Sequence, residues 1–363
     1  MALDYVPDYV SPEVQKHIIE LHEKGTKLKA CPVQVNTHAI RHWVETLEDG
    51  NPLYSNEEYA KKSPYGGIVA PPCTLPVWWI PYRWPWPPPE GGGESTTIIQ
   101  QIKMALDLPV TVSVSVEQEF YLPMKVGDKL FKKEVLVSIN PWEKTSFGEG
   151  HTYTVDILYY NQAKELVAKE RATSFSYGRK AKKSSGATLK GGWNVSVEEA
   201  LQGERSGYQQ KPSKPVRYED VKVGDELPSI FMPVTATRSV FLASATRDFA
   251  PVHSNRDYAQ QRGKMRDMWV NRPFMAGLVS RLLTDWAGPE AIVRKIWVGN
   301  IQGSVCAGDD MTVKGKVSKK YIENKEHLVE VEVMFHTQNG AASPCSGTVA
   351  LPSKGSGKAK ARA

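Results

Sequence analysis

The chain has 363 residues, of which 40% are hydrophobic and 24% are charged, as in a soluble globular protein of two or three domains. No run approaches the roughly 18 consecutive apolar residues of a membrane span, so we expect no such span. The net charge of +6 lies partly in residues 179–190 and 353–363, and no basic face is interleaved with aromatic residues, so we expect no nucleic-acid partner.

The N-terminus and the cysteines predict a cytoplasmic protein. The first eight residues have neither the basic start nor the apolar stretch of a signal peptide. The four cysteines, at positions 31, 73, 306 and 345, show no C-x-x-C spacing, so we expect neither a metal site nor a disulfide framework. Reduced thiols in the cytoplasm are the expected state.

The first predicted elements are a helical lead-in within residues 1–30 and a short strand. Ser11, followed by a proline and a glutamate, is typical of a capped helix N-terminus. Residues 33–36 alternate as a half-buried strand does. Residues 78–95 are so rich in proline, glycine and tryptophan that we expect no regular structure there.

Strands are predicted for the rest of the first half. Alternating β-branched and aromatic residues, separated by turn signals, indicate strands at 110–121, 130–140, 151–161 and 165–177. Residues 178–214 are rich in Lys, Ser, Gly and Gln and are predicted as a linker, with one short helix from Ser196 to Gln202.

The second half contains the clearest predicted helix, at 274–287, where Leu278, Leu282 and Trp286 share one face. Gly288-Pro289 should end it. A strand is expected at 230–237 and a helix near 238–247, and the further strands are expected near 294–304, 311–319, 327–337 and 344–351. Helices combined with runs of antiparallel strands indicate an α+β fold. The tail 353–363 is predicted to be flexible.

A repeat relates the two halves. Asp49-Gly-Asn-Pro-Leu-Tyr54-Ser-Asn-Glu-Glu-Tyr-Ala60 matches Asp248-Phe-Ala-Pro-Val-His253-Ser-Asn-Arg-Asp-Tyr-Ala259 at an offset of 199 residues, without a gap. A Gly-Asp turn follows each copy, after 78 residues in the first and 60 in the second, so we place an insertion at 78–95. A repeat of this length indicates tandem domains, which we place at 1–177 and 215–352.

One difference between the copies concerns chemistry, because His253 stands where the first copy has Tyr54. A histidine, with a pKa of about 6.5, can transfer protons near neutral pH, whereas a tyrosine, with a pKa of about 10, cannot act as a base there. Asp248 and His253 are therefore the candidate acid/base pair. Asp49 is expected to be a structural cap. On its own, an Asp and His pair in a loop also fits a purely structural role, in which the Asp caps a backbone amide and the His is partly exposed.

On these motifs, the second domain resembles the MaoC-like, or type 2 enoyl-CoA, hydratases and dehydratases. Their signature is an Asp, four residues and a His, followed later by an acidic or polar residue and Tyr-Ala. The family commonly has Asn where this chain has Ala250, and His-Gly where it has Asn271-Arg272. The latter variant is similar to the subgroup linked to bulky acyl-CoA substrates, including steroid side-chain hydratases. The first domain, with Asp49, Asn51 and the stretch 65–72, resembles the partner half of such enzymes.

The resemblance covers roughly residues 30–177 and 215–352 and implies a tandem hotdog fold, each half a helix wrapped by an antiparallel sheet. It implies addition or removal of water across the 2,3-double bond of an acyl-CoA, with Asp248 and His253 as catalytic residues. No metal or cofactor is implied, since coenzyme A is part of the substrate. The implied protein partner is a second copy or a related hotdog subunit.

Other residues are candidates for binding. Backbone N–H groups near Asn271 and Arg272, at the start of the 274–287 helix, are expected to bind the enolate oxygen. Arg262, Lys264 and Arg266 could meet the phosphates of coenzyme A or form a solvated basic loop. Trp78, Trp79, Trp84 and Trp86 could line an acyl pocket or cover the sheet. Arg281 and Asp285, four residues apart, are predicted to form a structural ion pair.

Three other functions fit parts of this pattern. A 3-hydroxyacyl carrier-protein dehydratase would need a basic patch at the tunnel mouth. A non-catalytic, acyl-thioester-binding partner subunit would not need the intact Asp248 and His253. A thioesterase can share the fold, but the hydratase spacing argues against it.

Overall fold

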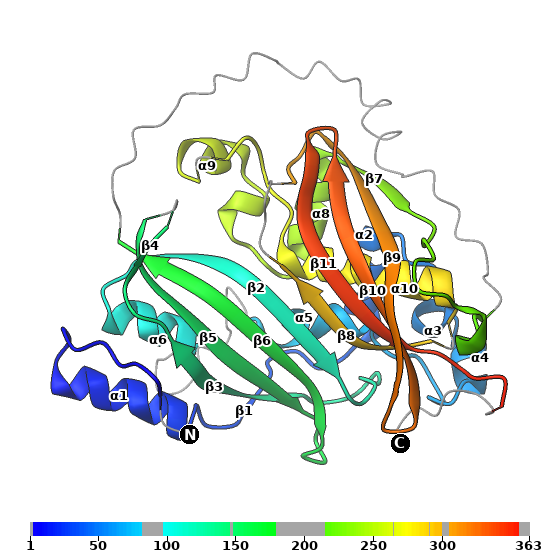
Figure 1. Cartoon of the computed structure of the whole chain (residues 1–363), viewed down its shortest axis with the longest axis horizontal. Coiled ribbons are helices and arrows are strands. Elements are labelled where there is room, and N and C mark those ends of the chain that lie inside the picture. The colour runs from blue at the N-terminus through cyan, green and yellow to red at the C-terminus, as the bar shows by residue number, and fades with distance from the viewer. Residues whose placement is uncertain are drawn as a thin grey trace. The chain divides into compact units, whose positions relative to one another are not determined.

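The computed structural model describes residues 3–81, 97–145, 148–178, 215–263, 265–289, 291–299 and 305–355. The chain divides into two units, each of which contains segments from more than one part of the sequence (Figure 1). Residues 1–34, 78–119 and 128–183 form the first unit, and residues 35–77, 120–127 and 184–363 form the second.

The first unit is a sheet with two helices beside it. Its strands run in the order β1 (Lys29–Ala30), β3 (Phe131–Ile139), β5 (Glu149–Tyr160), β6 (Leu166–Tyr177) and β2 (Val110–Phe120), and β4 (Glu143–Lys144) pairs with β5. The helices α1 (Pro12–Glu23) and α6 (Ile98–Ala105) pack on β3. Ser11 caps α1 as predicted, because its side chain accepts a hydrogen bond from the Val14 N–H.

The four long strands predicted for the first half are confirmed, whereas the strand predicted at 33–36 is wrong. Residues 33–36 have no strand partner and lead into α2 (Thr37–Leu47). The physical reason is a helix cap, since the Asn36 side chain accepts a hydrogen bond from the Ala39 N–H at 2.9 Å. The linker predicted at 178–214, with its short helix, lies almost entirely outside the described residues.

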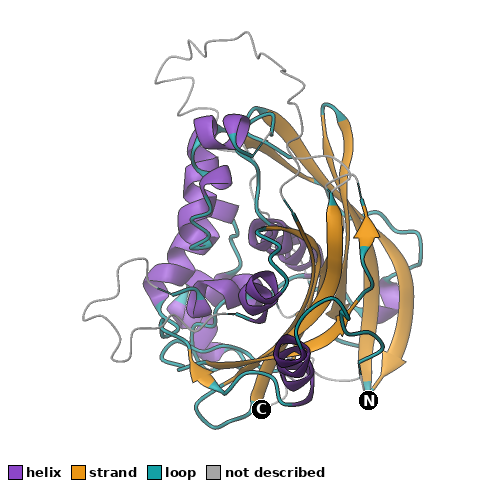
Figure 2. Ribbon diagram, turned by 90° about the vertical axis from the view of Figure 1, so that its left-hand side faces the viewer, coloured by secondary structure: helices purple, strands orange, loops and turns teal. Residues whose placement is uncertain are grey.

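The second unit is an antiparallel sheet around a long helix. The strands lie in the order β8 (Ile292–Val298), β11 (Gly340–Ala350), β10 (Glu326–Thr337), β9 (Asp309–Glu323) and β7 (Ile230–Val234). The helix α10 (Arg272–Ala287) packs on β8, β9 and β11, and Figure 2 shows strands curving around helices. As predicted, the helix ends at Gly288, whose φ of 89° favours glycine.

Helices from both halves of the sequence surround α10. α2 packs on α10 and on α8 (Ala236–Ala245). A Cβ atom at Gly277 would lie 2.6 Å from Leu47 Cδ1 and 2.9 Å from Trp43 Cζ2, so only glycine permits this approach. Residues 35–77 therefore cluster with the second unit. The domain limits predicted from the repeat, 1–177 and 215–352, differ from the limits of the two units. They describe how the sequence is duplicated, and they stay a prediction.

The repeat is visible in the local backbone. Glu48 after α2 and Arg247 after α8 both adopt the left-handed conformation, with φ of 53° and 57°. The short helices α4 (Glu57–Lys62) and α9 (Arg256–Gln261) each begin at an asparagine cap, Asn56 or Asn255. The same left-handed turn thus precedes both copies of the motif, and the same helix cap lies within both.

A glutamine makes the same pair of hydrogen bonds in each unit. Gln162 donates to Asp128 Oδ1 at 2.9 Å and accepts from the Lys129 N–H at 3.1 Å. Gln338 donates to Asp309 Oδ1 at 3.0 Å and accepts from the Asp310 N–H at 2.9 Å. The strand pairs that follow the two Gly-Asp turns are therefore held in the same way.

Candidate active site

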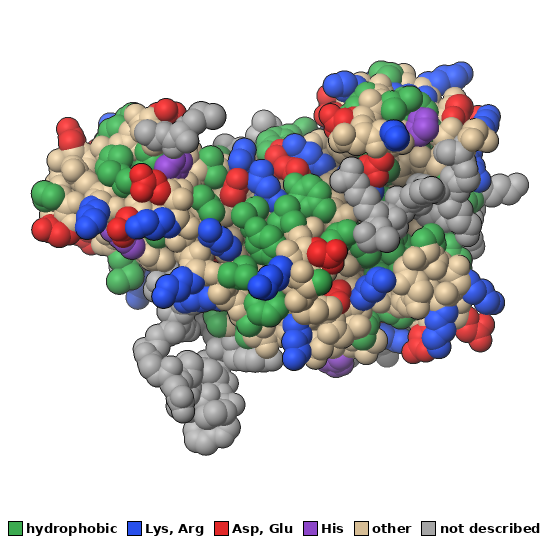
Figure 3. Space-filling model, turned by 90° about the horizontal axis from the view of Figure 1, so that it is seen from below, with side chains coloured by type: hydrophobic (Ala, Val, Ile, Leu, Met, Phe, Trp, Pro, Cys, Tyr) green, Lys and Arg blue, Asp and Glu red, His purple; other side chains and the backbone are tan. Residues whose placement is uncertain are grey.

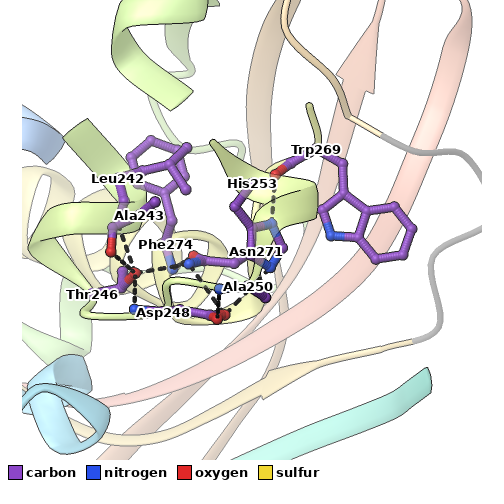
Figure 4. Close-up of polar contacts among 9 residues, drawn as sticks. All are labelled: Leu242, Ala243, Thr246, Asp248, Ala250, His253, Trp269, Asn271 and Phe274. Atoms are coloured by element: carbon purple, nitrogen blue, oxygen red, sulfur yellow. Dashed lines mark hydrogen bonds and ion pairs between the residues drawn. The ribbon is translucent and has the colours of Figure 1, made fainter. Parts of the chain in front are cut away.

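Asp248 and His253 lie side by side in the second unit (Figure 4). After α8, the left-handed Arg247 turns the chain, and Asp248 Oδ1 accepts a hydrogen bond from the Ala250 N–H at 3.3 Å. The single turn η3 (Pro251–His253) then brings the imidazole back toward the carboxylate. The distance from His253 Nε2 to Asp248 Oδ2 is 3.3 Å.

The other imidazole nitrogen is held by the backbone. His253 Nδ1 lies 2.8 Å from the carbonyl oxygen of Trp269, which can only accept, so Nδ1 carries the hydrogen. In the neutral ring Nε2 is then the unprotonated nitrogen, and it faces the carboxylate. The His253 side chain is 7% exposed and that of Asp248 is 31% exposed, so the carboxylate side of the pair is the accessible one.

Asn271 connects the pair to the start of α10. Its Oδ1 accepts a hydrogen bond from the Phe274 N–H at 3.1 Å, so it is the helix cap. Its Nδ2 donates to Thr246 Oγ1 at 2.7 Å and lies 3.5 Å from Asp248 Oδ2 (Figure 4). Sequence reasoning considered only the backbone at Asn271 and missed this side chain, although Asn-Arg-Pro is itself a capping pattern.

Two opposing effects set the ionisation of Asp248. Burial alone would raise its pKa. In the protonated state of the ring, the Nε2 hydrogen bond and charge of His253, together with the Ala250 N–H and the Asn271 amide, outweigh burial and lower the pKa of Asp248 below its ordinary value. The carboxylate is therefore ionised at neutral pH.

The first turn of α10 limits which amides could bind an enolate oxygen. Pro273 has no N–H, and the N–H of Phe274 is taken by Asn271 Oδ1. Binding of an enolate oxygen by the backbone amides of Asn271 and Arg272 stays a prediction. The guanidinium of Arg272 is buried, which lowers its pKa to about 10, and it donates to the Gly299 carbonyl at 2.7 Å.

The three basic residues proposed for phosphate binding differ in their surroundings. Arg266 Nη2 lies 2.6 Å from Asp309 Oδ2, so its charge is already paired with a carboxylate. Arg262 is exposed, and Lys264 lies outside the described residues. On the face seen in Figure 3, Lys and Arg side chains are interspersed with Asp and Glu. Phosphate binding at these positions stays a prediction.

The tryptophans proposed for an acyl pocket are only partly described. Trp78 and Trp79 belong to the short helix α5 (Leu75–Trp79). Trp78 is fully buried, and Lys132 Nζ lies 3.9 Å from the centre of the Trp79 ring. Trp84 and Trp86 lie outside the described residues.

Comparisons with known proteins agree with the predicted family and fold. Residues 22–170 match the FAS1-like dehydratase domain region. The chain is 34% identical over 141 residues to a probable enoyl-CoA hydratase alpha subunit of Thermomonospora curvata, a match that covers 38% of this chain and only 43% of that protein. It is 40% identical over 96 residues, 26% of its length, to the 3-oxo-4,17-pregnadiene-20-carboxyl-CoA hydratase beta subunit of Mycobacterium tuberculosis and covers 73% of that subunit.

A solved MaoC-like dehydratase superposes with a TM-score of 0.65 at 18% identity, over 92% of this chain and all of that one. The chain belongs to the MaoC-like hydratase and dehydratase family. A second match in fold is a Mycobacterium tuberculosis protein described as a double hotdog, with a TM-score of 0.59 at 12% identity, over 91% of this chain and 96% of that one. The tandem hotdog prediction is confirmed.

Within the described ranges, no helix is both long and apolar enough to cross a bilayer. In the same part of the chain, no three His, Cys, Asp or Glu side chains are grouped so as to hold a metal ion.

The first copy of the MaoC-like motif has a different environment. Asp49 is 6% exposed and Tyr54 is 7% exposed. Burial raises the pKa of Asp49 to about 6 and raises that of Tyr54 well above its ordinary value. Asp49 Oδ1 accepts a hydrogen bond from the Asn51 N–H at 3.0 Å, the capping contact expected from the sequence.

Asp49→Asn should stabilise the protein in a pH-dependent way. A carboxyl with a pKa of 3.8 unfolded and about 6 folded destabilises the folded state above pH 6, by up to about 3 kcal/mol. The native state keeps the proton longer, so this destabilisation grows from about pH 4 to pH 6. Asparagine can keep the hydrogen bond without the charge. Urea unfolding should show the variant gaining stability over the unsubstituted protein at pH 8 but not at pH 4; an equal difference at both would contradict this assignment.

Proposed function

We propose that the chain is an enoyl-CoA hydratase, or in the reverse direction a 3-hydroxyacyl-CoA dehydratase, that acts on a bulky acyl group. The observation that carries this proposal is the 3.3 Å approach of His253 Nε2 to Asp248 Oδ2, with Nδ1 fixed by a carbonyl. Family membership and two relatives named as hydratase subunits support it, one of them for a steroid-like carboxyl-CoA.

The geometry gives a water molecule two acceptors. Neutral Nε2 and ionised Oδ2 both lack a hydrogen, so a water molecule beside the pair can donate one hydrogen to each. A lone pair of the water oxygen is then free to attack C3 of the enoyl thioester. The proton goes to His253 because an imidazole is a stronger base than a carboxylate, and the pKa of Asp248 is lowered further here. Asp248 stabilises the imidazolium that forms.

The electrons of the double bond then move toward the thioester carbonyl as an enolate. The first-turn amides of α10 would stabilise its oxygen, and a donor of this kind is typically worth about 3 kcal/mol of barrier. The imidazolium is the acid available to protonate C2, which completes the addition of water. The reaction needs no redox cofactor, and coenzyme A enters as part of the substrate.

The decisive experiment offers the purified chain a series of trans-2-enoyl-CoAs of increasing bulk and follows loss of the conjugated thioester absorbance. We expect turnover that rises with acyl bulk and falls by about 100-fold or more in His253→Ala. The same acyl group attached to a carrier protein distinguishes this activity from that of a carrier-protein dehydratase, which should prefer the carrier-protein thioester. No turnover on any thioester, with or without a second hotdog subunit, would refute the proposal.

We also propose that the chain assembles with a second copy or with a related hotdog subunit. The supporting observation is that the relatives are named as alpha and beta subunits, and that the chain covers less than half of the alpha-subunit relative. Light scattering on the purified chain measures its assembly state. A monomer that is fully active alone would argue against this proposal.

A further inference from the structure

The sheet of the first unit buries an unusual set of polar side chains on one face. Lys132 on β3 lies opposite Tyr159 on β5, and Ile157 lies opposite both Glu134 on β3 and Glu170 on β6. Because side chains alternate along a strand, all of these point to the same face. Tyr159, Glu134 and Glu170 are at most 7% exposed.

The corresponding positions of the second unit are apolar, although Ser343, opposite Phe335, is a buried polar residue on the same face. Phe335 precedes Gln338 by the same interval as Tyr159 precedes Gln162. Phe335 pairs with Val313, and Val333 pairs with Gly315 and Cys345. Val313, Gly315, Phe335 and Cys345 therefore take the places of Lys132, Glu134, Tyr159 and Glu170. Polar groups are unfavourable in an interior unless they are paired, so their presence in one unit alone needs an explanation.

Part of the polar set has a structural role. Glu134 accepts hydrogen bonds from the Ile98 N–H and from Lys132 Nζ, each at 2.6 Å. It thereby satisfies an N-terminal N–H of α6. Lys132 in turn lies over the Trp79 ring. The ion pair is accounted for by anchoring this helix to the sheet.

Three side-chain atoms of this buried polar set have no such structural role. Tyr159 Oη, Gln118 Oε1 and Trp79 Nε1 are buried without a hydrogen-bond partner, and they are the only such side-chain atoms in the described part of the first unit. Gln118 Nε2 donates to Glu170 Oε2 at 2.6 Å, which fixes Oε1 as the free acceptor. An unpaired buried polar group typically costs about 1–3 kcal/mol.

We propose that Tyr159, Gln118 and Trp79 form a subsite for an uncharged oxygen function, hydroxyl or keto, on a bulky apolar acyl group. A hydroxyl can accept from Tyr159 or Trp79 and donate to Gln118 Oε1, and a keto oxygen can accept from the two donors. Buried Glu134 and Glu170 disfavour a carboxylate in this place. The choice of an acyl ligand rests on the proposed function; the subsite rests on the unpaired atoms.

The test is equilibrium binding of unreactive saturated thioesters to the full chain by calorimetry. The probes are cholanoyl-CoA and its 3-hydroxy and 3-oxo derivatives, which differ only in the ring oxygen. We expect at least one oxygenated probe to bind about tenfold or more tightly than cholanoyl-CoA, the usual scale of one buried hydrogen bond. Tyr159→Phe should abolish that preference and leave the affinity for cholanoyl-CoA unchanged.

Tyr153→Phe is the matched control, because Tyr153 lies on the same strand and face but its hydroxyl already bonds to Ser176 Oγ at 2.8 Å. This control should lower the melting temperature and keep the preference. Tyr159→Phe should not lower the melting temperature, since no protein hydrogen bond is lost.

Equal affinities for all probes, no binding of any of them, or a preference retained in Tyr159→Phe would overturn the subsite. These measurements need no turnover. A chain that shows the preference but hydrates no enoyl-CoA would therefore refute the proposed function alone, and a hydratase without the preference would refute the subsite alone.

Discussion

Asp248→Asn and His253→Ala should each lower kcat for hydration by about 100-fold or more, the usual scale for a positioned acid or base. His253→Ala removes the acceptor for the water proton. Asp248→Asn removes the charge that stabilises the imidazolium, while an asparagine Oδ1 can still accept from the Ala250 N–H. Initial rates at saturating enoyl-CoA measure the effect, and urea unfolding shows whether each variant stays folded.

The first copy of the motif provides the matched controls. Asp49→Asn and Tyr54→Phe change the corresponding positions, where both side chains are buried and the tyrosine pKa is far above neutral. Each should leave kcat within a fewfold of the unsubstituted protein. Equal losses of kcat from both copies would show that both take part in catalysis and would contradict the assignment to the second copy.

Loss of Asp285 should produce the largest fall in stability. Arg281 and Asp285 are 0% and 5% exposed, and Arg281 Nε lies 3.2 Å from Asp285 Oδ2. Arg281 also donates to the Leu47 carbonyl at 2.5 Å. Asp285→Ala would leave the buried guanidinium without this carboxylate, and breaking a buried pair in this way typically costs about 3–5 kcal/mol. Urea unfolding at neutral pH measures the change.

An exposed pair with the same spacing is the control. Arg41 and Glu45 on α2 are also four residues apart, with a 2.8 Å contact, but their side chains are 71% and 60% exposed. Glu45→Ala should cost less than about 1 kcal/mol, because solvent screens an exposed pair. A similar loss for the two variants would show that burial is not what makes Asp285 important.

Local chemistry in the sequence was sufficient to predict most strands, α10 and the Asp248–His253 pair, whereas the tandem hotdog fold was implied by the resemblance of these motifs to a known family. Strand alternation, the Gly-Asp turns and the Gly288 stop are properties of neighbouring residues, so they can be read without knowing what packs against them. The same holds for the Asp and His, since only five positions separate them. The strand predicted at residues 33–36 was wrong because the helix cap made by Asn36 outweighed a weak alternation of apolar and polar residues.

Only the tertiary structure decided which groups the fold leaves paired or unpaired. Asn271 reaches Thr246 and Asp248 across 23 or more residues, and Arg266 is neutralised by Asp309, 43 residues away. Likewise, the clustering of residues 35–77 with the second unit depends on how closely helices approach at Gly277. The unpaired hydroxyl of Tyr159 has no signal in the sequence at all, because burial and hydrogen bonding are set by distant strands, whereas alternation and capping are set by neighbours.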